Sequence, residues 1–190
     1  MNIEGDKYRT VDNWVGFVPE PDADIPINYL EIGAYYGANV ISFGQSHYAK
    51  HPATQIHCID PWLDYNDYDE YKGQQDSIYE TFKRNLVTNG LKDRVQVHKG
   101  FSGDLVPSFT NAFFDIIYID GNHEPQYILE DAVLAFRKLK PNGYLIFDDY
   151  GWRDASIGID AFLQAYSKCY TMIMPNHNTQ VFIQKLDIKL

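Results

Sequence analysis

Cysteine, long apolar runs and basic residues are all scarce in this 190-residue sequence. Its two cysteines, Cys58 and Cys169, cannot build a disulfide framework and are typical of a protein from a reducing compartment. No stretch approaches the roughly 18 apolar residues of a membrane span. Residues 1–20 also lack the basic start and apolar run of a secretory signal. We therefore expect a cytoplasmic protein that does not insert into a membrane.

The shortage of positive charge excludes one class of partner. Sixteen Lys and Arg residues stand against 26 Asp and Glu residues, so the formal net charge is −10. Because a protein that binds nucleic acid must neutralise phosphates, we expect no nucleic-acid partner. The length and a hydrophobic share of 45% predict one globular domain over residues 1–190. Within it, residues 1–27 are expected to form a cover segment and residues 61–76 an acidic, tyrosine-rich insert.

Short apolar runs alternate with longer helical patterns along the chain. This alternation predicts an α/β fold, because a strand, a crossover helix and a second strand form a parallel sheet. The last two apolar runs are too close together for a crossover and should pair antiparallel. We predict a mostly parallel, seven-stranded sheet with an antiparallel C-terminal hairpin and helices on both faces. The expected strands are 28–33, 56–60, 94–98, 114–119, 144–147, 170–174 and 180–184, and the expected helices are 37–50, 77–90, 125–140 and 154–168.

The residues that follow the first strands indicate the ligand, because open α/β sheets bind ligands beyond the carboxyl ends of their strands. The loop at 31–37 lacks the G-x-G-x-x-G pattern of a dinucleotide site, and Glu31 beside it favours a cationic ligand over a pyrophosphate. Asp60 ends the second strand, where a carboxylate can accept hydrogen bonds from both ribose hydroxyls. Residues 100–102 follow the third strand and could flank an adenine. A nucleoside joined to a cationic amino acid, S-adenosylmethionine (SAM), fits this set.

Three segments carry a resemblance to a known family: Leu30-Glu-Ile-Gly-Ala-Tyr-Tyr-Gly37, Ile59-Asp-Pro-Trp62 and Tyr118-Ile-Asp-Gly-Asn-His-Glu124. With the segment 139–149, they resemble class I SAM-dependent methyltransferases with a Rossmann-like sheet. The branch they resemble most contains the macrocin-type, metal-dependent sugar O-methyltransferases (methyltransferase family 24). The resemblance runs over about residues 28–152. It implies these cofactor-binding residues: Glu31, Gly33, Ala34, Tyr35, Gly37, Asn39, Asp60, Pro61, Trp62, Gly100, Phe101, Ser102 and Asp120.

The same resemblance implies a metal site and a catalytic base. Asp120, Asp148 and Asp149 match its divalent-metal ligands, and His123 matches its base, with Asp120 beside it at the reacting centre. Physical reasoning supports the metal, because carboxylates at the ends of two neighbouring strands repel one another unless a cation lies between them. Oxygen ligands favour Mg²⁺ or Mn²⁺. The alternative is that Asp148 or Asp149 caps a helix or faces solvent.

These observations favour a metal-dependent SAM O-methyltransferase that acts on a hydroxyl of a sugar, a glycoside or another glycan. The tyrosines and carboxylates of residues 61–80 suit a sugar, by stacking and by accepting hydrogen bonds, although the segment could equally be a solvated loop. A catechol-type acceptor, a nicotinamide-dependent oxidoreductase and a non-catalytic SAM- or glycan-binding module remain as alternatives. The sequence leaves open a homo-oligomer, and a module beside glycosyltransferase domains rather than a free enzyme.

Overall fold

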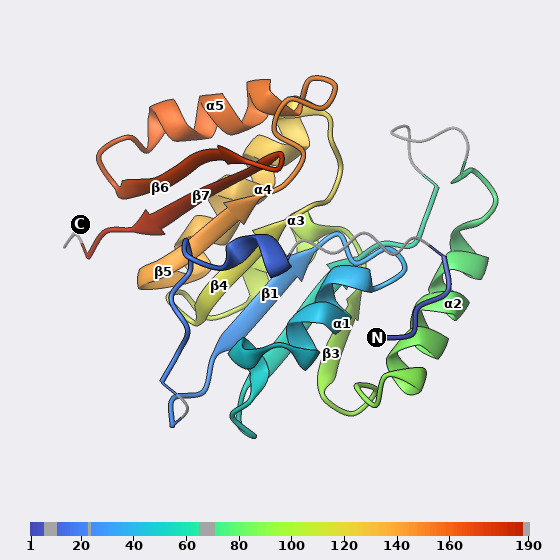
Figure 1. Ribbon diagram of the computed structural model, residues 1–190. Coiled ribbons are helices and arrows are strands. Elements are labelled where there is room, and N and C mark those ends of the chain that lie inside the picture. The colour runs from blue at the N-terminus through green and yellow to red at the C-terminus, as the bar shows by residue number, and fades with distance from the viewer. Residues whose placement is uncertain (6–10, 23, 65–70, 188–190) are drawn as a thin grey trace.

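The computed structural model describes residues 1–5, 11–22, 24–64 and 71–187, and it has the predicted α/β fold (Figure 1). Seven strands of the described residues form one sheet in the order β3-β2-β1-β4-β5-β7-β6. The pairs among β1 to β5 are parallel, whereas β7 runs antiparallel to both β5 and β6. The strands are β1 (Asn28–Ile32), β2 (Gln55–Asp60), β3 (Val95–Lys99), β4 (Phe114–Ile119), β5 (Leu139–Phe147), β6 (Tyr170–His177) and β7 (Gln180–Lys185).

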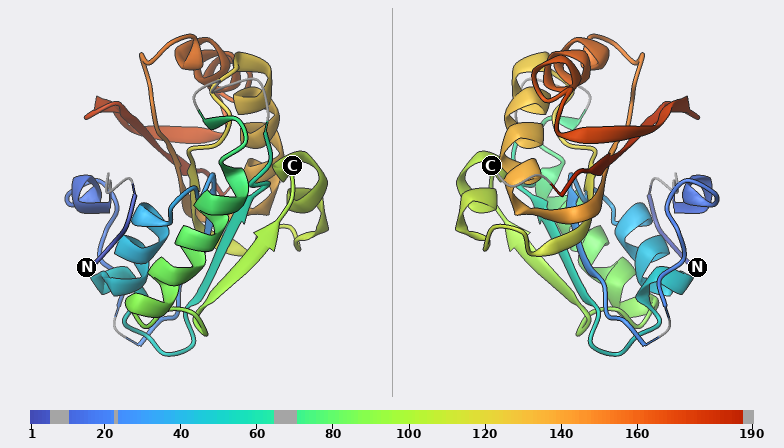
Figure 2. Two further views of the ribbon diagram at one scale, coloured as in Figure 1. Left: turned by 90° about the vertical axis from the view of Figure 1, so that its right-hand side faces the viewer. Right: turned by 90° about the vertical axis from the view of Figure 1, so that its left-hand side faces the viewer.

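Helices cover the sheet on both faces, as Figure 2 shows. One face packs against η1 (Val11–Trp14), α1 (Ala38–Gln45), η2 (His47–Ala49) and α2 (Gln75–Thr88), with buried Trp14 among the rings of Tyr29, Phe43 and Tyr118. The other face packs against α4 (Pro125–Lys138) and α5 (Ala155–Ala165). The short α3 (Ser102–Leu105) and η4 (Val106–Ser108) follow β3. Within the described ranges, no helix has both the length and the apolar character that crossing a bilayer requires.

The fold prediction is confirmed, but several boundaries differ. The expected helix over 37–50 ends at Gln45, because the Ser46 hydroxyl accepts a hydrogen bond from the Tyr48 amide and starts η2 instead. Strand β5 begins at Leu139, five residues before the predicted start. The segment Pro141-Asn-Gly143 has the composition of a turn, yet it forms an irregularity inside β5, with Asn142 at φ 62°. Buried Leu139 continues the strand before that irregularity because it pairs with Phe114.

The C-terminal hairpin turns later than its composition predicts. Residues 175–178 were the expected turn, whereas β6 continues to His177 and the two turn residues are Asn178 and Thr179. Both have positive φ values, 49° and 68°. Two such residues match the right-handed twist of the flanking strands, as in a type I′ hairpin. The hairpin therefore brings Thr179 to the end of β5, where its backbone carbonyl accepts a hydrogen bond from the Tyr150 amide.

The buried His57 and the half-buried His98, on neighbouring strands, make the stability of the fold sensitive to acid. His57 Nδ1 lies 3.0 Å from His98 Nε2, and the rings of Phe109, Phe113 and Phe114 surround the His57 imidazole. Burial and then His98 lower the pKa of His57 to about 4. The folded protein therefore binds fewer protons than the unfolded chain between about pH 6.5 and 4, so stability is lost as the pH falls through that window.

We expect the melting temperature to fall by several degrees between pH 7 and pH 5, since about 1 kcal/mol shifts a domain of this size by about 2–4 °C. In His57→Phe, which keeps a ring among the phenylalanines, the fall should be smaller. Differential scanning calorimetry measures both, with His51→Gln as the matched loss of a partly exposed histidine. An equal slope in wild type and His57→Phe would assign the acid sensitivity to other groups.

Candidate active site

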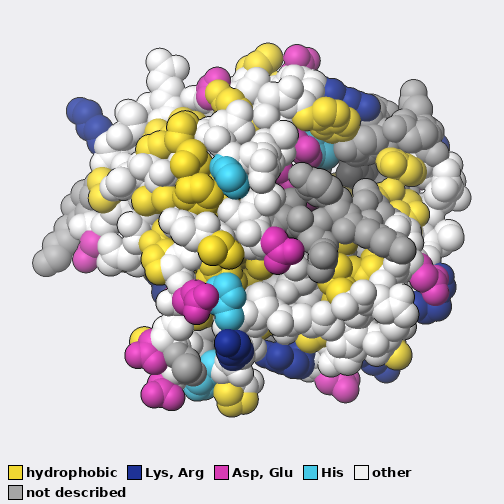
Figure 3. Space-filling view, in the orientation of Figure 1, with side chains coloured by type: hydrophobic (Ala, Val, Ile, Leu, Met, Phe, Trp, Pro, Cys, Tyr) yellow, Lys and Arg dark blue, Asp and Glu magenta, His cyan; other side chains and the backbone are white. Residues whose placement is uncertain are grey.

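A cavity of about 850 Å³ opens beyond the carboxyl ends of β1, β2 and β4. Figure 3 shows acidic and histidine side chains together at a hollow on this side of the molecule. Its volume lies in the range of small-molecule sites, roughly 300–1,000 Å³. Ten of the predicted cofactor-binding residues line it: Glu31, Gly33, Ala34, Tyr35, Asn39, Asp60, Pro61, Phe101, Ser102 and Asp120.

Glu31 lies at the floor of the cavity in a hydrogen-bonded network. The Tyr29 hydroxyl donates to Glu31 Oε2 at 2.7 Å, and Asn39 Nδ2 donates to the same oxygen at 3.1 Å. The side chain is 1% exposed, and this burial raises the pKa of Glu31 to about 8. A buried carboxylate of this kind is stabilised by a cationic group beside it, which agrees with the expected ammonium-bearing ligand.

Strand packing requires a glycine at position 33, and the predicted contact of Gly33 with the cofactor stays a prediction. The φ of Gly33 is 92°, and a Cβ at this position would overlap the backbone carbonyl of Asp120. The end of β1 therefore approaches the end of β4 more closely than any side chain allows. This contact brings the loop at 33–37 beside Asp120, whose amide donates to the Ile32 carbonyl at 2.8 Å.

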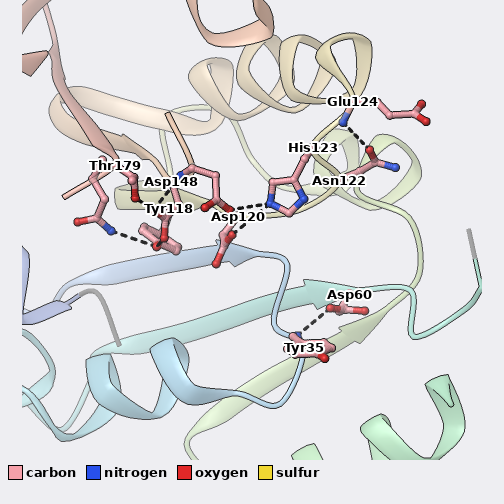
Figure 4. Close-up of polar contacts among 11 residues, drawn as sticks. Tyr35, Asp60, Tyr118, Asp120, Asn122, His123, Glu124, Asp148 and Thr179 are labelled. Atoms are coloured by element: carbon pink, nitrogen blue, oxygen red, sulfur yellow. Dashed lines mark hydrogen bonds and ion pairs between the residues drawn. The ribbon is translucent and has the colours of Figure 1, made fainter. Parts of the chain in front are cut away.

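The Asp60 carboxylate is held in a fixed orientation at the end of β2 (Figure 4). Asp60 Oδ2 accepts from the Tyr35 amide at 2.8 Å, and Oδ1 accepts from the Trp62 amide at 2.7 Å. Burial raises the pKa of Asp60, and these backbone donors oppose that shift. A carboxylate has about four acceptor sites, so acceptor capacity remains for a ligand hydroxyl beside these backbone donors. The geometry thus suits the ribose-binding role expected of this residue.

Three predicted cofactor residues lie outside the lining. Trp62 is buried against Tyr79 and Phe82 of α2, and its indole nitrogen donates to the Tyr35 carbonyl. Gly37 packs against Phe82, and Gly100 packs against Leu105. These residues shape the loops that line the cavity without facing it.

Asp131 is a site residue that the sequence reasoning missed. It lines the cavity beside Ser102 from helix α4, is 3% exposed, and accepts a hydrogen bond from the Ser102 side chain. Burial raises its pKa to about 7, against the opposing effect of Ser102. The sequence did contain a signal for Asp131, because Ile128, Asp131 and Ala135 share the buried face of α4. An acidic side chain on a buried face needs a polar partner.

His123 and two aspartates form a compact cluster at the other end of the cavity. His123 Nε2 lies 2.7 Å from Asp149 Oδ2 and 3.8 Å from Asp120 Oδ1. One ligand atom from each of the three lies within 4.8 Å of the others, which is the spacing that a metal ion needs. The edge of the Trp152 ring packs against the imidazole, with centroids 4.7 Å apart. Burial, and then the charges of Asp148 and Asp149, raise the pKa of Asp120, while its contact with His123 opposes that rise.

Asp148 lies behind this cluster with partners for both of its oxygens. The Tyr118 hydroxyl donates to Oδ2, while the Asp149 amide and the Thr179 hydroxyl donate to Oδ1 at 2.8 and 3.2 Å. Burial raises its pKa to about 6, and the Tyr118 hydroxyl opposes that shift. The three predicted metal ligands are therefore adjacent, but His123 rather than Asp148 completes the compact triad. The role of Asp148 as a ligand stays a prediction.

Aromatic and polar side chains complete the wall near the His123 cluster. None of them belonged to the predicted site, although Tyr71 falls in the tyrosine-rich insert; residues 65–70 of that insert lie outside the described ranges. Most of them lie in loops that follow strands, where they could have been found, whereas Tyr127 lies in the first turn of α4; Trp152 comes from the loop before α5. These additional lining residues are Tyr36, Tyr71, Asn122, Glu124, Tyr127 and Trp152.

Comparisons with known proteins agree with this geometry. A family model described as a methyltransferase domain matches residues 30–150. An uncharacterized protein of Acanthamoeba polyphaga mimivirus is 28% identical over 130 residues, which are 65% of this chain. This chain spans about half (52%) of that curated relative's length.

Solved structures of O-methyltransferases share the fold. NovP matches with a TM-score of 0.68 and 18% identity over 93% of this chain and 76% of its own. TomG from Streptomyces achromogenes, solved with SAM, matches with a TM-score of 0.63 and 19% identity over 84% of this chain and 73% of its own. An O-methyltransferase from Bacillus cereus, solved with SAH, matches with a TM-score of 0.61 and 17% identity over 84% of this chain and 74% of its own. By the family model and by its sheet order, the chain belongs to the class I methyltransferase-domain family.

Proposed function

We propose that the protein is a metal-dependent SAM O-methyltransferase that methylates a hydroxyl of a sugar or glycoside. One observation carries the proposal: the same cavity is lined by the oriented Asp60 carboxylate and by a cluster of His123 with Asp120 and Asp149. A methyl donor and a deprotonated hydroxyl must meet in one enclosed space for transfer to occur. The SAM and SAH complexes of TomG and the Bacillus cereus enzyme support the choice of cofactor.

In this proposal Phe101 and Ser102 would hold the adenine end of the cofactor, and Glu31 would hold its amino-acid end. Asp60 would accept from the ribose hydroxyls, and Ser102 and Asp131 would lie beside the adenine. Glu31 lies at the amino-acid end, where a carboxylate stabilises an ammonium group. SAM supplies the activated methyl group, and the chain supplies its orientation toward Asp120 and His123.

The donor set of the cluster fits a divalent metal. Asp120 and Asp149 offer carboxylate oxygens with Asp148 beside them, and this oxygen-rich set favours Mg²⁺ or Mn²⁺. When bound there, such an ion lowers the pKa of an alcohol and fixes its orientation. His123 accepts the acceptor's proton at an imidazole nitrogen, and Asp149 stabilises the resulting imidazolium. The Trp152 ring packs at about a right angle against this imidazole and helps to hold its orientation.

The cavity lining indicates the chemistry of the acceptor. Tyr36, Tyr71 and Trp152 offer flat apolar faces, and Asn122 offers an amide, which suits a ring that carries hydroxyls. Ten of the described lining residues are acidic and none is Lys or Arg, so an anionic acceptor is disfavoured. The aromatic faces also suit a catechol, which is the second candidate acceptor.

A direct test measures transfer of a labelled methyl group from SAM to a panel of neutral glycosides and catechols, with mass spectrometry of the products. We expect an O-methylated glycoside. Binding of NAD(H) instead of SAM would point to the oxidoreductase alternative, and cofactor binding without turnover on any hydroxyl to a binding module.

Replacing Asp60 should separate cofactor binding from the rest of the site. We expect Asp60→Ala to weaken SAM and SAH binding by at least about 10- to 100-fold, since one charged hydrogen bond contributes roughly 1.5–3 kcal/mol. Isothermal titration calorimetry measures the affinity. Asp115→Ala is the matched control, because that aspartate pairs with Lys140 away from the cavity lining. Wild-type affinity in Asp60→Ala would remove this residue from the cofactor site.

A further inference from the structure

The segment Asn2–Gly5, here called the strap, lies along α2 and is held through its backbone. Asn89 Oδ1 accepts from the Asn2 amide at 3.0 Å, and Asn89 Nδ2 donates to the Asn2 carbonyl at 2.7 Å. Asn85 repeats the arrangement on Glu4, with distances of 2.9 and 3.0 Å. In Figure 1 the dark-blue N-terminal trace lies beside α2. Each asparagine thus pairs with a peptide group as another strand would.

The spacing of the two asparagines matches an extended segment. Four helical residues rise about 6.0 Å, and two residues of a strand span about 6.6 Å. The residue between the two pairs, Ile3, is 5% exposed and belongs to the core cluster of that face. Helix α2 therefore carries a binding site for an extended backbone with one apolar side chain, and the strap occupies it.

The strap also touches the wall of the cavity. Asn85 Nδ2 donates a further hydrogen bond to the Tyr36 carbonyl at 2.9 Å. Gly5, at φ 83°, lies so close to the Tyr36 ring that a Cβ would come within 2.6 Å of Cδ1. Tyr36 lines the cavity, and the preceding residue, Tyr35, donates its amide to Asp60. One buried asparagine therefore joins the strap, the helix and the cofactor loop.

We propose that the docked strap is a positioning element, which holds the loop at 33–37 in the arrangement that binds the nucleoside. Release of the strap removes the contacts of Gly5 and loosens Asn85, so Tyr36 and Tyr35 lose support and cofactor affinity falls. Asn85 is a positioning residue, since it acts through Tyr36. The effect on affinity rests on the proposed function, whereas the coupling of strap and loop does not.

The test uses the full chain with a substitution that removes one backbone donor. Glu4→Pro deletes the amide that donates to Asn85 Oδ1, and Glu4→Ala is the matched control because both variants lose the ion pair with Arg84. Hydrogen–deuterium exchange reports on residues 2–5 and 33–39, and calorimetry reports on SAH affinity. In Glu4→Pro we expect faster exchange in both segments and an affinity about fivefold to tenfold weaker, the scale of about one net hydrogen bond. Glu4→Ala should resemble wild type.

Two further variants distinguish the release of the strap from a general loss of stability. Ile3→Asp releases the strap by another route and should reproduce Glu4→Pro. Ile183→Val removes a methylene from buried β7 on the opposite face and should lower stability without changing exchange at 33–39. Faster exchange in the strap with unchanged exchange at 33–39 and unchanged affinity would overturn the proposal. If wild type binds no SAH, the proposed function fails, while exchange at 33–39 still decides the coupling.

Discussion

Removal of divalent cations with EDTA is expected to lower methyl transfer by at least about 100-fold, the scale of losing one pre-organised electrostatic contact at a reacting oxygen. Addition of Mg²⁺ or Mn²⁺ should restore it. The reason is the donor set, since Asp120 and Asp149 converge within 4.8 Å in a cavity lined by no Lys or Arg among its described residues. A radiolabelled methyl assay on chelated and reloaded protein measures the effect.

Two aspartate variants make this expectation specific to the cluster. Asp149→Asn should weaken metal binding more than Asp148→Asn, because the Asp148 oxygens already accept from Tyr118 and Thr179. A supporting group of that kind typically contributes about 10- to 100-fold in metal affinity. Titration with Mn²⁺ followed by electron paramagnetic resonance compares the variants. Full turnover in metal-free protein would refute the proposed metal dependence, while the proposal that the protein binds SAM would stand.

The order of strands and helices along the chain could be predicted because apolar runs and helical patterns alternate, and each is recognised from residues close together in the sequence. Apolar runs such as Phe114–Ile119 are buried on both faces, and their spacing leaves room for crossover helices. The boundaries that failed depend on contacts far along the chain. Nothing near Leu139 in sequence shows that it pairs with Phe114, and nothing in the Pro141-Asn-Gly143 composition shows that β5 continues through it.

The site was predictable where the sheet itself places residues. Asp60 ends β2, and Asp120 and Asp149 follow β4 and β5, so topology places all three at one edge of the sheet and in one cavity. The direction in which each side chain points does not follow from the topology. Asp148 and Asp149 are adjacent in sequence, yet Asp149 has φ 58° and faces His123 while Asp148 faces Tyr118. The contribution of α4 through Asp131, and of α2 through Asn85, depends on helix packing that strand positions do not specify.

His123→Ala is expected to keep cofactor affinity and to lose about 10²–10⁴-fold in kcat, the usual effect of removing a placed base. The imidazole has the required geometry, because Nε2 lies 2.7 Å from Asp149 and the carboxylate stabilises the protonated ring. Since only a neutral imidazole accepts a proton, the wild-type rate should rise with pH along a limb that the variant lacks. Steady-state kinetics over pH 5–9, with calorimetry for SAH, measures these quantities.

The metal cluster supplies the discriminating control, because His123 is also within reach of a metal ion. If His123 acts as the base, His123→Ala retains Mn²⁺ affinity and loses kcat, whereas loss of both would make the imidazole a ligand. Asn122→Ala, one residue away in the same loop, should change the acceptor KM rather than the pH limb, since its carboxamide lines the cavity and accepts from the Glu124 amide. Retention of near-normal kcat with an unchanged pH profile in His123→Ala would mean that the proton leaves by another route.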